Sequence, residues 1–213
     1  MKTILSLGLI TLALTFCGLG DKLKQLSGGS GNADGANSSS NGSSKTSSGN
    51  IEQPKPTETQ QAIIDGGTET TWDAQGISWR LPAGFNKMQV LKESFNYGSP
   101  AAGFLIASVS VMPDDFPSES SIEANYTSAL EQLKQGKYES VRWLEIDGVK
   151  GVEWVEAMPE IRDGARRHQW IAARRYLGQN QQLNIMVSTD GDKFDKRRDT
   201  FAAIMYSMKI PKG

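Results

Sequence analysis

Cysteine and histidine are almost absent from the sequence. Cys17 is the only cysteine and His168 the only histidine among 213 residues. A single cysteine excludes an intrachain disulfide and any zinc site built from several thiolates. A single histidine excludes the metal sites that use several imidazoles. We therefore expect no metal and no cofactor, and we assign no catalytic residue.

A large net charge is lacking too. The chain has 23 lysines and arginines against 24 aspartates and glutamates, which gives a formal net charge of −1. Nucleic-acid-binding proteins usually carry a clear excess of positive charge, because they neutralise phosphates. We therefore expect no nucleic-acid partner.

The first 16 residues have the pattern of a signal peptide. Lys2 supplies the positive charge, and residues 3–16 form an apolar run. A helix needs about 20 apolar residues to cross a bilayer, and this run is shorter. We interpret residues 1–16 as a lipoprotein signal peptide.

The residues around Cys17 resemble a lipobox, the recognition site of lipoprotein signal peptidase. Leu14 and Cys17 match the usual pattern, and Gly18 is the expected small residue after the cysteine. Phe16 departs from the pattern, because a small residue normally precedes the cysteine. The resemblance implies that Cys17 is lipidated and holds the chain at a membrane of the cell envelope, facing the periplasm or the exterior. The alternative is ordinary cleavage near residues 18–20, which releases a soluble secreted protein.

A polar tether follows the cysteine. Nineteen of the 24 residues from 27 to 50 are serine, glycine or asparagine. Such a composition buries too little apolar surface to order the chain. Pro54 and Pro56 continue the stretch in a stiffer form. We predict a flexible tether over residues 17–62 and one globular domain over residues 63–213.

The expected domain begins with three strands and a helix. Alternating apolar residues predict strands at 76–81, 87–95 and 104–112. The apolar period then changes to that of a helix over about 120–133, and a second helix is expected at 192–208.

Four strands between the two helices are predicted to form an antiparallel meander. Asp147-Gly148 is a typical two-residue hairpin turn, and it places Trp143 opposite Val152. The next loop is assumed to be symmetric about Arg162. That symmetry pairs Trp154 with Trp170 and Glu156 with His168.

The same registers predict one aromatic face on the meander, because side chains alternate along a strand. A turn at 178–181 would set Tyr176 beside Leu183 on this face. The aromatic residues that share it are Trp143, Trp154, Trp170 and Tyr176. Such a face can line a pocket for a sugar, lipid or peptide. Packing beneath the last helix is the interpretation that we prefer.

The predicted fold class is α+β, an antiparallel sheet between helices in the order βββαββββα. The opening Gly-Ile-Ser-Trp-Arg-Leu-Pro-Ala-Gly-Phe, the hairpin Ile-Asp-Gly-Val-Lys-Gly and the last helix Phe-Ala-Ala-Ile-Met-Tyr-Ser-Met together resemble PsbP-like domains. This group includes the extrinsic photosystem II protein, a eukaryotic Ran-binding import factor and many bacterial lipoproteins. The resemblance covers about residues 76–210. It implies an α/β/α sandwich with a non-catalytic binding or assembly role.

Five arginines lie within fourteen residues, and they form the candidate surface for an anionic partner. They are Arg162, Arg166, Arg167, Arg174 and Arg175. Guanidinium groups bind phosphates and carboxylates well, which suits an anionic component of the envelope or an acidic protein. The alternative is pairing with nearby acidic residues: Glu153, Glu156, Glu160 and Asp163.

His168 with Glu156 is the one candidate for acid–base chemistry. A nucleophile such as Ser188 would also be needed, and nothing in the sequence places one beside His168. The leading hypothesis is therefore a lipid-anchored, non-catalytic binding protein. The competing hypothesis is a secreted hydrolase or small-ligand-binding protein that uses a cleft near His168 and the arginine-rich loop.

Overall fold

The computed structural model describes residues 50–211. Cys17, the predicted signal peptide and tether residues 17–49 lie outside the described residues. In chain order the elements are α1 (Glu58–Gly66), β1 (Thr68–Trp72), β2 (Ile77–Leu81), β3 (Asn86–Val90), β4 (Ser94–Ser99), β5 (Gly103–Met112), α2 (Ser118–Lys134), β6 (Tyr138–Ile146), β7 (Val149–Glu156), β8 (Ala165–Tyr176), β9 (Gln179–Asp190) and α3 (Gly191–Tyr206).

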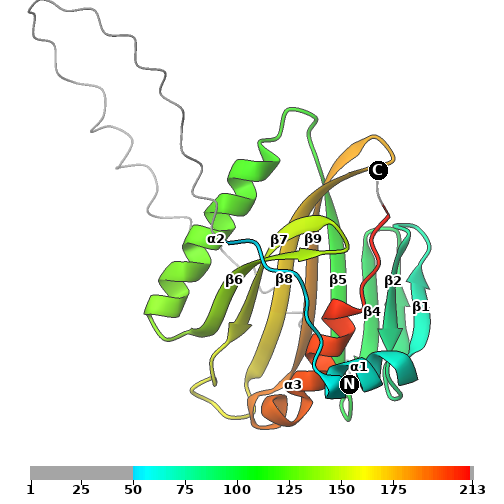
Figure 1. Ribbon diagram of the computed structural model, residues 1–213, viewed down its shortest axis with the longest axis vertical. Helices are drawn as coiled ribbons and strands as arrows, with labels where there is room; N and C mark the ends of the chain where they lie inside the picture. The colour runs from blue at the N-terminus through cyan, green and yellow to red at the C-terminus, as the bar shows by residue number, and fades with distance from the viewer. Residues whose placement is uncertain (1–49, 212–213) are drawn as a thin grey trace, which may run out of the picture. The chain divides into compact units, whose positions relative to one another are not determined.

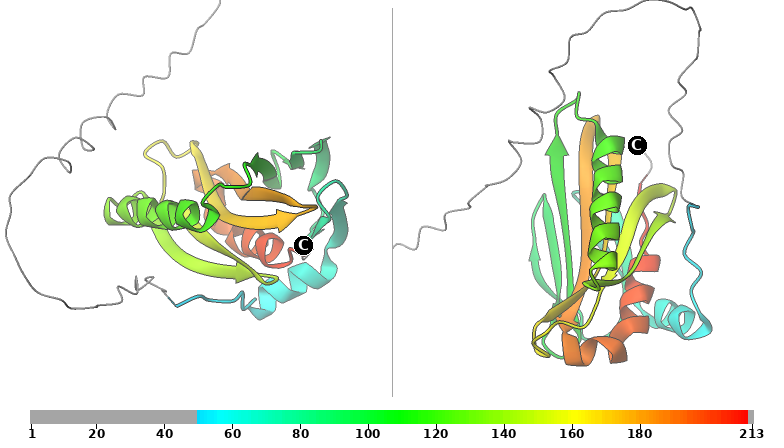
Figure 2. Two further views of the ribbon diagram at one scale, coloured as in Figure 1. Left: turned by 90° about the horizontal axis from the view of Figure 1, so that it is seen from above. Right: turned by 90° about the vertical axis from the view of Figure 1, so that its left-hand side faces the viewer.

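The centre of the domain is a seven-stranded sheet in the order β3-β4-β5-β9-β8-β7-β6, and all its neighbouring strands are antiparallel (Figure 1). β1 and β2 form a separate two-stranded sheet. α2 and α3 cover opposite faces of the large sheet (Figure 2). The predicted α+β fold, an antiparallel sheet between helices, is confirmed. No helix within residues 50–211 is long and apolar enough to span a membrane.

The part of the fold before α2 contains more helices and strands than predicted. The strand expected at 87–95 is two strands, β3 and β4, which reverse direction at a turn where the Leu91 amide donates to the Ser94 carbonyl, 2.8 Å away. β1 and α1 were not predicted. Their side chains give little hydrophobic signal, because Trp72 is the only buried residue of β1 and α1 has none.

Residues 50–66, which we call the arm, lie against the domain. The predicted tether included residues 50–62, so its C-terminal boundary is wrong. The Glu52 amide donates to the Trp143 carbonyl (3.1 Å), and the Glu145 amide donates to the Glu52 carbonyl (2.8 Å), which adds Glu52 to the edge of β6. α1 begins at a capping box between Thr57 and Gln60. None of the arm's side chains is buried, so hydrophobic patterning could not reveal its attachment.

The β6–β7 register is as predicted, with Trp143 opposite Val152 across the Asp147-Gly148 turn. The β7–β8 register differs from the prediction by one residue, because Trp154 lies opposite Gln169. The connecting loop is not symmetric about Arg162. It contains a turn in which the Gly164 amide donates to the Ile161 carbonyl, 2.8 Å away.

A shift of one residue moves every side chain of a strand to the other face. Trp143 and Trp154 therefore pack beneath α2, whereas Trp170 is part of the core beneath α3. The single aromatic face predicted from the sequence is wrong. The predicted pairing of Tyr176 with Leu183 is also wrong. The β8–β9 turn lies at Leu177-Gly178, which places Tyr176 opposite Gln179 and Leu183 opposite Ala172.

Two apolar cores result, one on each face of the large sheet. The larger lies between this sheet, the small sheet and α3, and its largest side chains are Trp72, Trp79, Phe95, Trp170, Phe194 and Phe201. The smaller lies beneath α2 and contains Ile122, Ala129, Trp143, Val152, Trp154 and Ile171. Burial of each large apolar side chain stabilises a fold by roughly 1.5–3 kcal/mol.

Candidate functional site

His168 lies on β8 and faces α3, where it pairs with Glu153 of β7. The distance from Nε2 of His168 to Oε1 of Glu153 is 2.7 Å, and both side chains are buried. Nε of Arg142 donates to the other carboxylate oxygen of Glu153 at 2.5 Å. The predicted pairing of His168 with Glu156 is wrong. The register shift places Glu156 on the α2 face, where it pairs with Arg167 at 2.9 Å.

Arg142 connects the buried Glu153 to two other parts of the chain. Its Nη1 lies 2.7 Å from Oε2 of Glu52 in the arm, and its Nη2 donates to the Tyr206 hydroxyl of α3 at 2.7 Å. Burial alone would raise the pKa of the Glu153 carboxyl, but His168 and Arg142 together hold that pKa below its usual range. Burial and the Glu153 charge raise the pKa of the Tyr206 hydroxyl. Glu153 is thus ionised and Tyr206 protonated at neutral pH.

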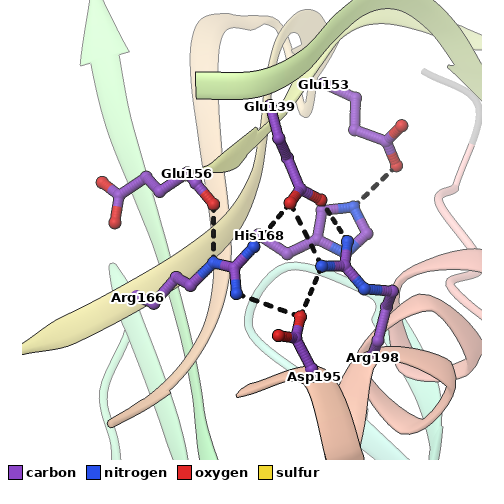
Figure 3. A network of polar contacts seen from close by, with 7 residues as sticks. All are labelled: Glu139, Glu153, Glu156, Arg166, His168, Asp195 and Arg198. Atoms are coloured by element: carbon purple, nitrogen blue, oxygen red, sulfur yellow. Dashed lines mark hydrogen bonds and ion pairs between the residues drawn. The ribbon is translucent and has the colours of Figure 1, made fainter. Parts of the chain in front are cut away.

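A second group of ion pairs lies beside the first and is centred on Arg166 (Figure 3). The Arg166 side chain is buried, and its three nitrogens all donate. Nε donates to the Glu156 backbone carbonyl (2.7 Å), Nη1 to Asp195 (3.0 Å) and Nη2 to Glu139 (2.5 Å). Arg198 of α3 binds the same two carboxylates. Arg166 is therefore fully engaged within the fold.

A cavity of about 290 Å³ borders both groups and brings hydroxyls near His168. Ser140 and Tyr206 line it, but within residues 50–211 neither makes a hydrogen bond to His168. Ser188 lies opposite Arg167 and so on the other face of the sheet. No group of three or more metal-ligating side chains is found in the same range. The arrangement ties α3 to strands β6–β8 through ion pairs.

The five candidate arginines do not form one surface. Arg162 is exposed in the loop between β7 and β8, while Arg166 and Arg167 point to opposite faces of β8. Arg174 and Arg175 lie at the other end of this twelve-residue strand. The alternative of pairing with nearby acidic residues holds for Arg167, which binds Glu156, whereas Arg166 pairs with Glu139 and Asp195, which were not among the expected partners.

Arg174 is different, because it is buried without a carboxylate partner among the described residues. Its Nε donates to the Gln181 side chain (2.9 Å), and its Nη2 donates to the side-chain and backbone oxygens of Gln75 (2.8 and 3.1 Å). The guanidinium lies 4.3 Å from the centre of the Tyr176 ring. Nη1 is buried and has no partner within residues 50–211. Burial lowers the pKa of Arg174 to about 10.

Arg174 borders a cavity of about 440 Å³ between α2 and the β6–β7 hairpin. The apolar part of the lining is Ile122, Trp143, Val149, Ala173 and Pro211. The charged part is Glu119, Glu123, Lys150, Arg174 and Arg175. Within the described range none of these five makes a salt bridge. We call this the α2 cavity and take it as the candidate binding site.

Sequence reasoning found three residues of the α2 cavity and missed the others. Trp143, Arg174 and Arg175 were candidates, although for different sites. Glu119, Glu123 and Lys150 were not candidates for any site. Lys150 lies 4.1 Å above the Trp143 ring, a contact that follows from the correctly predicted hairpin register.

No family model matches the sequence, and no curated protein matches it. Three solved structures are similar in fold. A protein of Bacteroides thetaiotaomicron has a TM-score of 0.44 at 14% identity, covering 69% of this chain and 49% of that one. Cyanobacterial PsbP from Synechocystis has a TM-score of 0.45 at 13% identity, and the match covers 68% of this chain and 94% of that one. The Saccharomyces cerevisiae Ran-binding protein Mog1p has a TM-score of 0.37 at 11% identity, and the match covers 68% of this chain and 96% of that one.

This chain spans about half the length of the Bacteroides protein. The PsbP-like group that the sequence resembles includes a PsbP protein and a Ran-binding protein, and both kinds of protein are among these three structures. With TM-scores below 0.5, these likenesses support no statement about activity or ligand.

Proposed function

We propose that the chain is a lipid-anchored protein of the cell envelope whose domain binds another molecule and catalyses no reaction. The observation that carries the binding role is the contrast between the two candidate sites. The side chains suited to acid–base chemistry, His168 and Glu153, are buried and tied into ion pairs. The α2 cavity, in contrast, has apolar side chains in its lining and carries five charged side chains with no ion-pair partner among residues 50–211.

The anchor rests on the sequence around Cys17 and on the polar stretch that separates it from the domain. Cys17→Ala is expected to shift the protein from the membrane fraction to the soluble fraction after cell lysis. Phe16→Ala restores the small residue of the lipobox and serves as the matched variant, which should be processed at least as well as the wild type. Continued membrane association of Cys17→Ala would count against the anchor.

The binding role predicts that the α2 cavity contacts a protein or an anionic component in the envelope. A photo-crosslinking side chain in place of Val149, which lines the cavity, should give a discrete adduct in intact cells. The same side chain at Leu177, an exposed turn residue on the same domain, is the control. Absence of an adduct at residue 149, or the same adducts at both positions, would oppose the binding role of this cavity.

One observation favours the competing hydrolase. The 290 Å³ cavity contains His168, Glu153 and the Ser140 hydroxyl together. If Ser140 were a nucleophile, Ser140→Ala would abolish the hydrolysis of small activated esters. Our proposal expects ester turnover by the purified protein to be equal in wild type and Ser140→Ala.

A further inference from the structure

The place where the arm lies on the domain is a second candidate binding site. We propose that the outer edge of β6 binds an extended peptide of a partner protein, and that the arm occupies this edge when the partner is absent. The partner peptide runs parallel to β6 and carries a carboxylate side chain beside Arg142. This proposal goes beyond the binding role of the α2 cavity and does not depend on it.

The first argument is the open edge of β6. It is the last strand of the large sheet, so one side of its backbone has no neighbouring strand of that sheet. Such an edge presents amides and carbonyls with which another extended chain can pair. Within residues 50–211 the arm pairs with it only at Glu52, through the carbonyl of Trp143 and the amide of Glu145. Backbone groups alternate in direction along a strand, so those of Val141 point to the same open side. The edge therefore has room for a longer strand than the arm provides.

The second argument is the guanidinium that lies beside this edge. Nη1 of Arg142 lies 2.7 Å from Oε2 of Glu52. The other guanidinium nitrogens donate to Glu153 and to the Tyr206 hydroxyl, so the domain itself holds Arg142 in place. A cation that is fixed in advance spares an incoming peptide the cost of ordering it. A carboxylate on that peptide can therefore accept a charge-assisted hydrogen bond, which sets the register of the added strand.

The third argument is the loose fit of the arm. None of its side chains is buried. A cavity of about 580 Å³ is lined by the residues around Glu52 together with Arg142 and Tyr206. A second cavity, of about 400 Å³, is lined by Pro54, Pro56 and the end of β6. A side chain that fills either space makes van der Waals contacts that the arm lacks. A partner peptide can therefore compete with the arm, although the arm is linked to the domain and so has a high effective concentration.

The experiment adds a separate peptide, with the sequence of residues 47–57, to the purified protein and follows the backbone amides by NMR. In the variant Glu52→Pro the arm loses the amide and the carboxylate that hold it to β6, so the edge becomes free. We expect the peptide to bind Glu52→Pro more tightly than the wild type by about tenfold or more, because the arm no longer competes. The shifted amides should be those of Val141, Trp143 and Glu145.

Two results of this titration would overturn the proposal. One is a peptide affinity of Glu52→Pro no higher than that of the wild type. The other is a set of shifts at Ala173 in the α2 cavity and none on β6. Light scattering of the wild type tests a second copy as the occupant, and a monomer is expected. A dimer that Glu52→Pro abolishes would mean that the edge receives the arm of a second copy, which would also overturn the proposal.

Two further changes link the binding to the edge and to Arg142. Glu145→Pro removes the outward amide that donates to the added chain, and an edge strand tolerates proline at such a position. In the Glu52→Pro background it should abolish peptide binding. A peptide that carries Glu52→Gln loses the ion pair with Arg142, which is partly exposed, and should bind up to about fivefold more weakly.

Met88→Pro is the matched control, because Met88 is exposed on β3, at the opposite edge of the same sheet, where the register shifts. In the Glu52→Pro background it should leave the peptide affinity unchanged. Equal peptide affinity in Glu145→Pro and Met88→Pro would overturn the proposal. An adduct from residue 149 in cells combined with failure of the peptide would refute the β6 site and leave the binding role of the α2 cavity intact.

Discussion

Nε2 of His168 lies 2.7 Å from Oε1 of Glu153, while Arg142 binds the other oxygen of the same carboxylate. This buried carboxylate therefore joins three neighbouring strands. Through Arg142 the same cluster reaches Tyr206 on α3 and Glu52 in the arm. Side chains that would suggest catalysis in the sequence thus act as a structural junction between the sheet, a helix and the arm.

The first prediction concerns the stability that this junction provides. Glu153→Ala is expected to lower the free energy of unfolding by about 3–5 kcal/mol, because it breaks the buried pair with His168 and removes one of the two carboxylates that bind Arg142. Urea denaturation measures the change. Glu160→Ala in the exposed β7–β8 loop is the control and should stay within about 0.5 kcal/mol of the wild type. If Glu153→Ala is as harmless as Glu160→Ala, the cluster does not stabilise the fold.

The second prediction is a loss of stability in acid that depends on Glu153. Its pKa is lower in the folded protein than in the unfolded chain, where a glutamate has a pKa of about 4.3. The unfolded state therefore binds the proton first, and the stability from Glu153 is present above pH ~4.3 and lost as pH falls through the folded value. Arg142, His168 and Tyr206 surround the carboxylate, and the hydrogen bonds from His168 and Arg142 favour its charged form.

Urea denaturation of wild type and Glu153→Gln between pH 3 and 7 measures this dependence. The free energy of unfolding should fall more steeply below pH ~4.3 in the wild type than in Glu153→Gln. Parallel curves for the two proteins would contradict the assignment of a lowered pKa to Glu153.

The meander shows how far sequence can specify a register. The two-residue turn Asp147-Gly148 leaves one alignment of β6 and β7, and that alignment is correct. The eight residues between Glu156 and Ala165 allow several alignments of β7 with β8. The turn at Ile161–Gly164 selects an alignment that differs by one residue from the alignment expected for a symmetric loop. The consequence is large, since one residue of shift exchanges the partners of His168 and separates Trp154 from Trp170.

The candidate site was harder to predict than the fold, and the reason is physical. Arg166 and Arg174 are both buried arginines of β8, yet one meets two carboxylates and the other meets amides. The difference comes from Glu139, Asp195 and Gln75, which lie far away in the sequence. Local patterns therefore identify the arginines but cannot say which of them lacks a partner.

The third prediction is that the arm detaches more readily than the rest of the domain. It has no buried side chain and is held by polar contacts, such as Gln60 to Asp199 at 2.8 Å and Arg80 to the Ile64 carbonyl at 3.1 Å. Hydrogen exchange should show the amides of α1 opening at lower free energy than those of β8 and β9. Gln60→Ala, which also removes half of the capping box, should speed exchange in α1 without changing β8. Equal protection of α1 and β8 would contradict this.

The fourth prediction tests the close packing of Trp170 against Gly151. The Trp170 indole crosses Gly151 on β7 and donates from Nε1 to the Leu144 carbonyl on β6, 3.0 Å away. A Cβ on residue 151 would lie 2.6 Å from two atoms of this ring and 2.6 Å from the Ile171 carbonyl oxygen. Trp170 is fully buried and cannot move aside without disturbing the main core. Gly151→Ala should therefore lower the free energy of unfolding by about 1–3 kcal/mol, and by more if the Leu144 hydrogen bond breaks.

Gly66→Ala is the matched control for this substitution. The added Cβ at residue 66 meets no atom within 4 Å, and the residue lies at the end of α1. Alanine favours helix over glycine, so Gly66→Ala should be neutral or stabilising by up to about 1 kcal/mol. Urea denaturation of both variants separates a general effect of alanine from a steric effect of the Trp170 ring. If Gly151→Ala is as stable as Gly66→Ala, the indole has room to move. That result would contradict the close packing of Trp170 against Gly151.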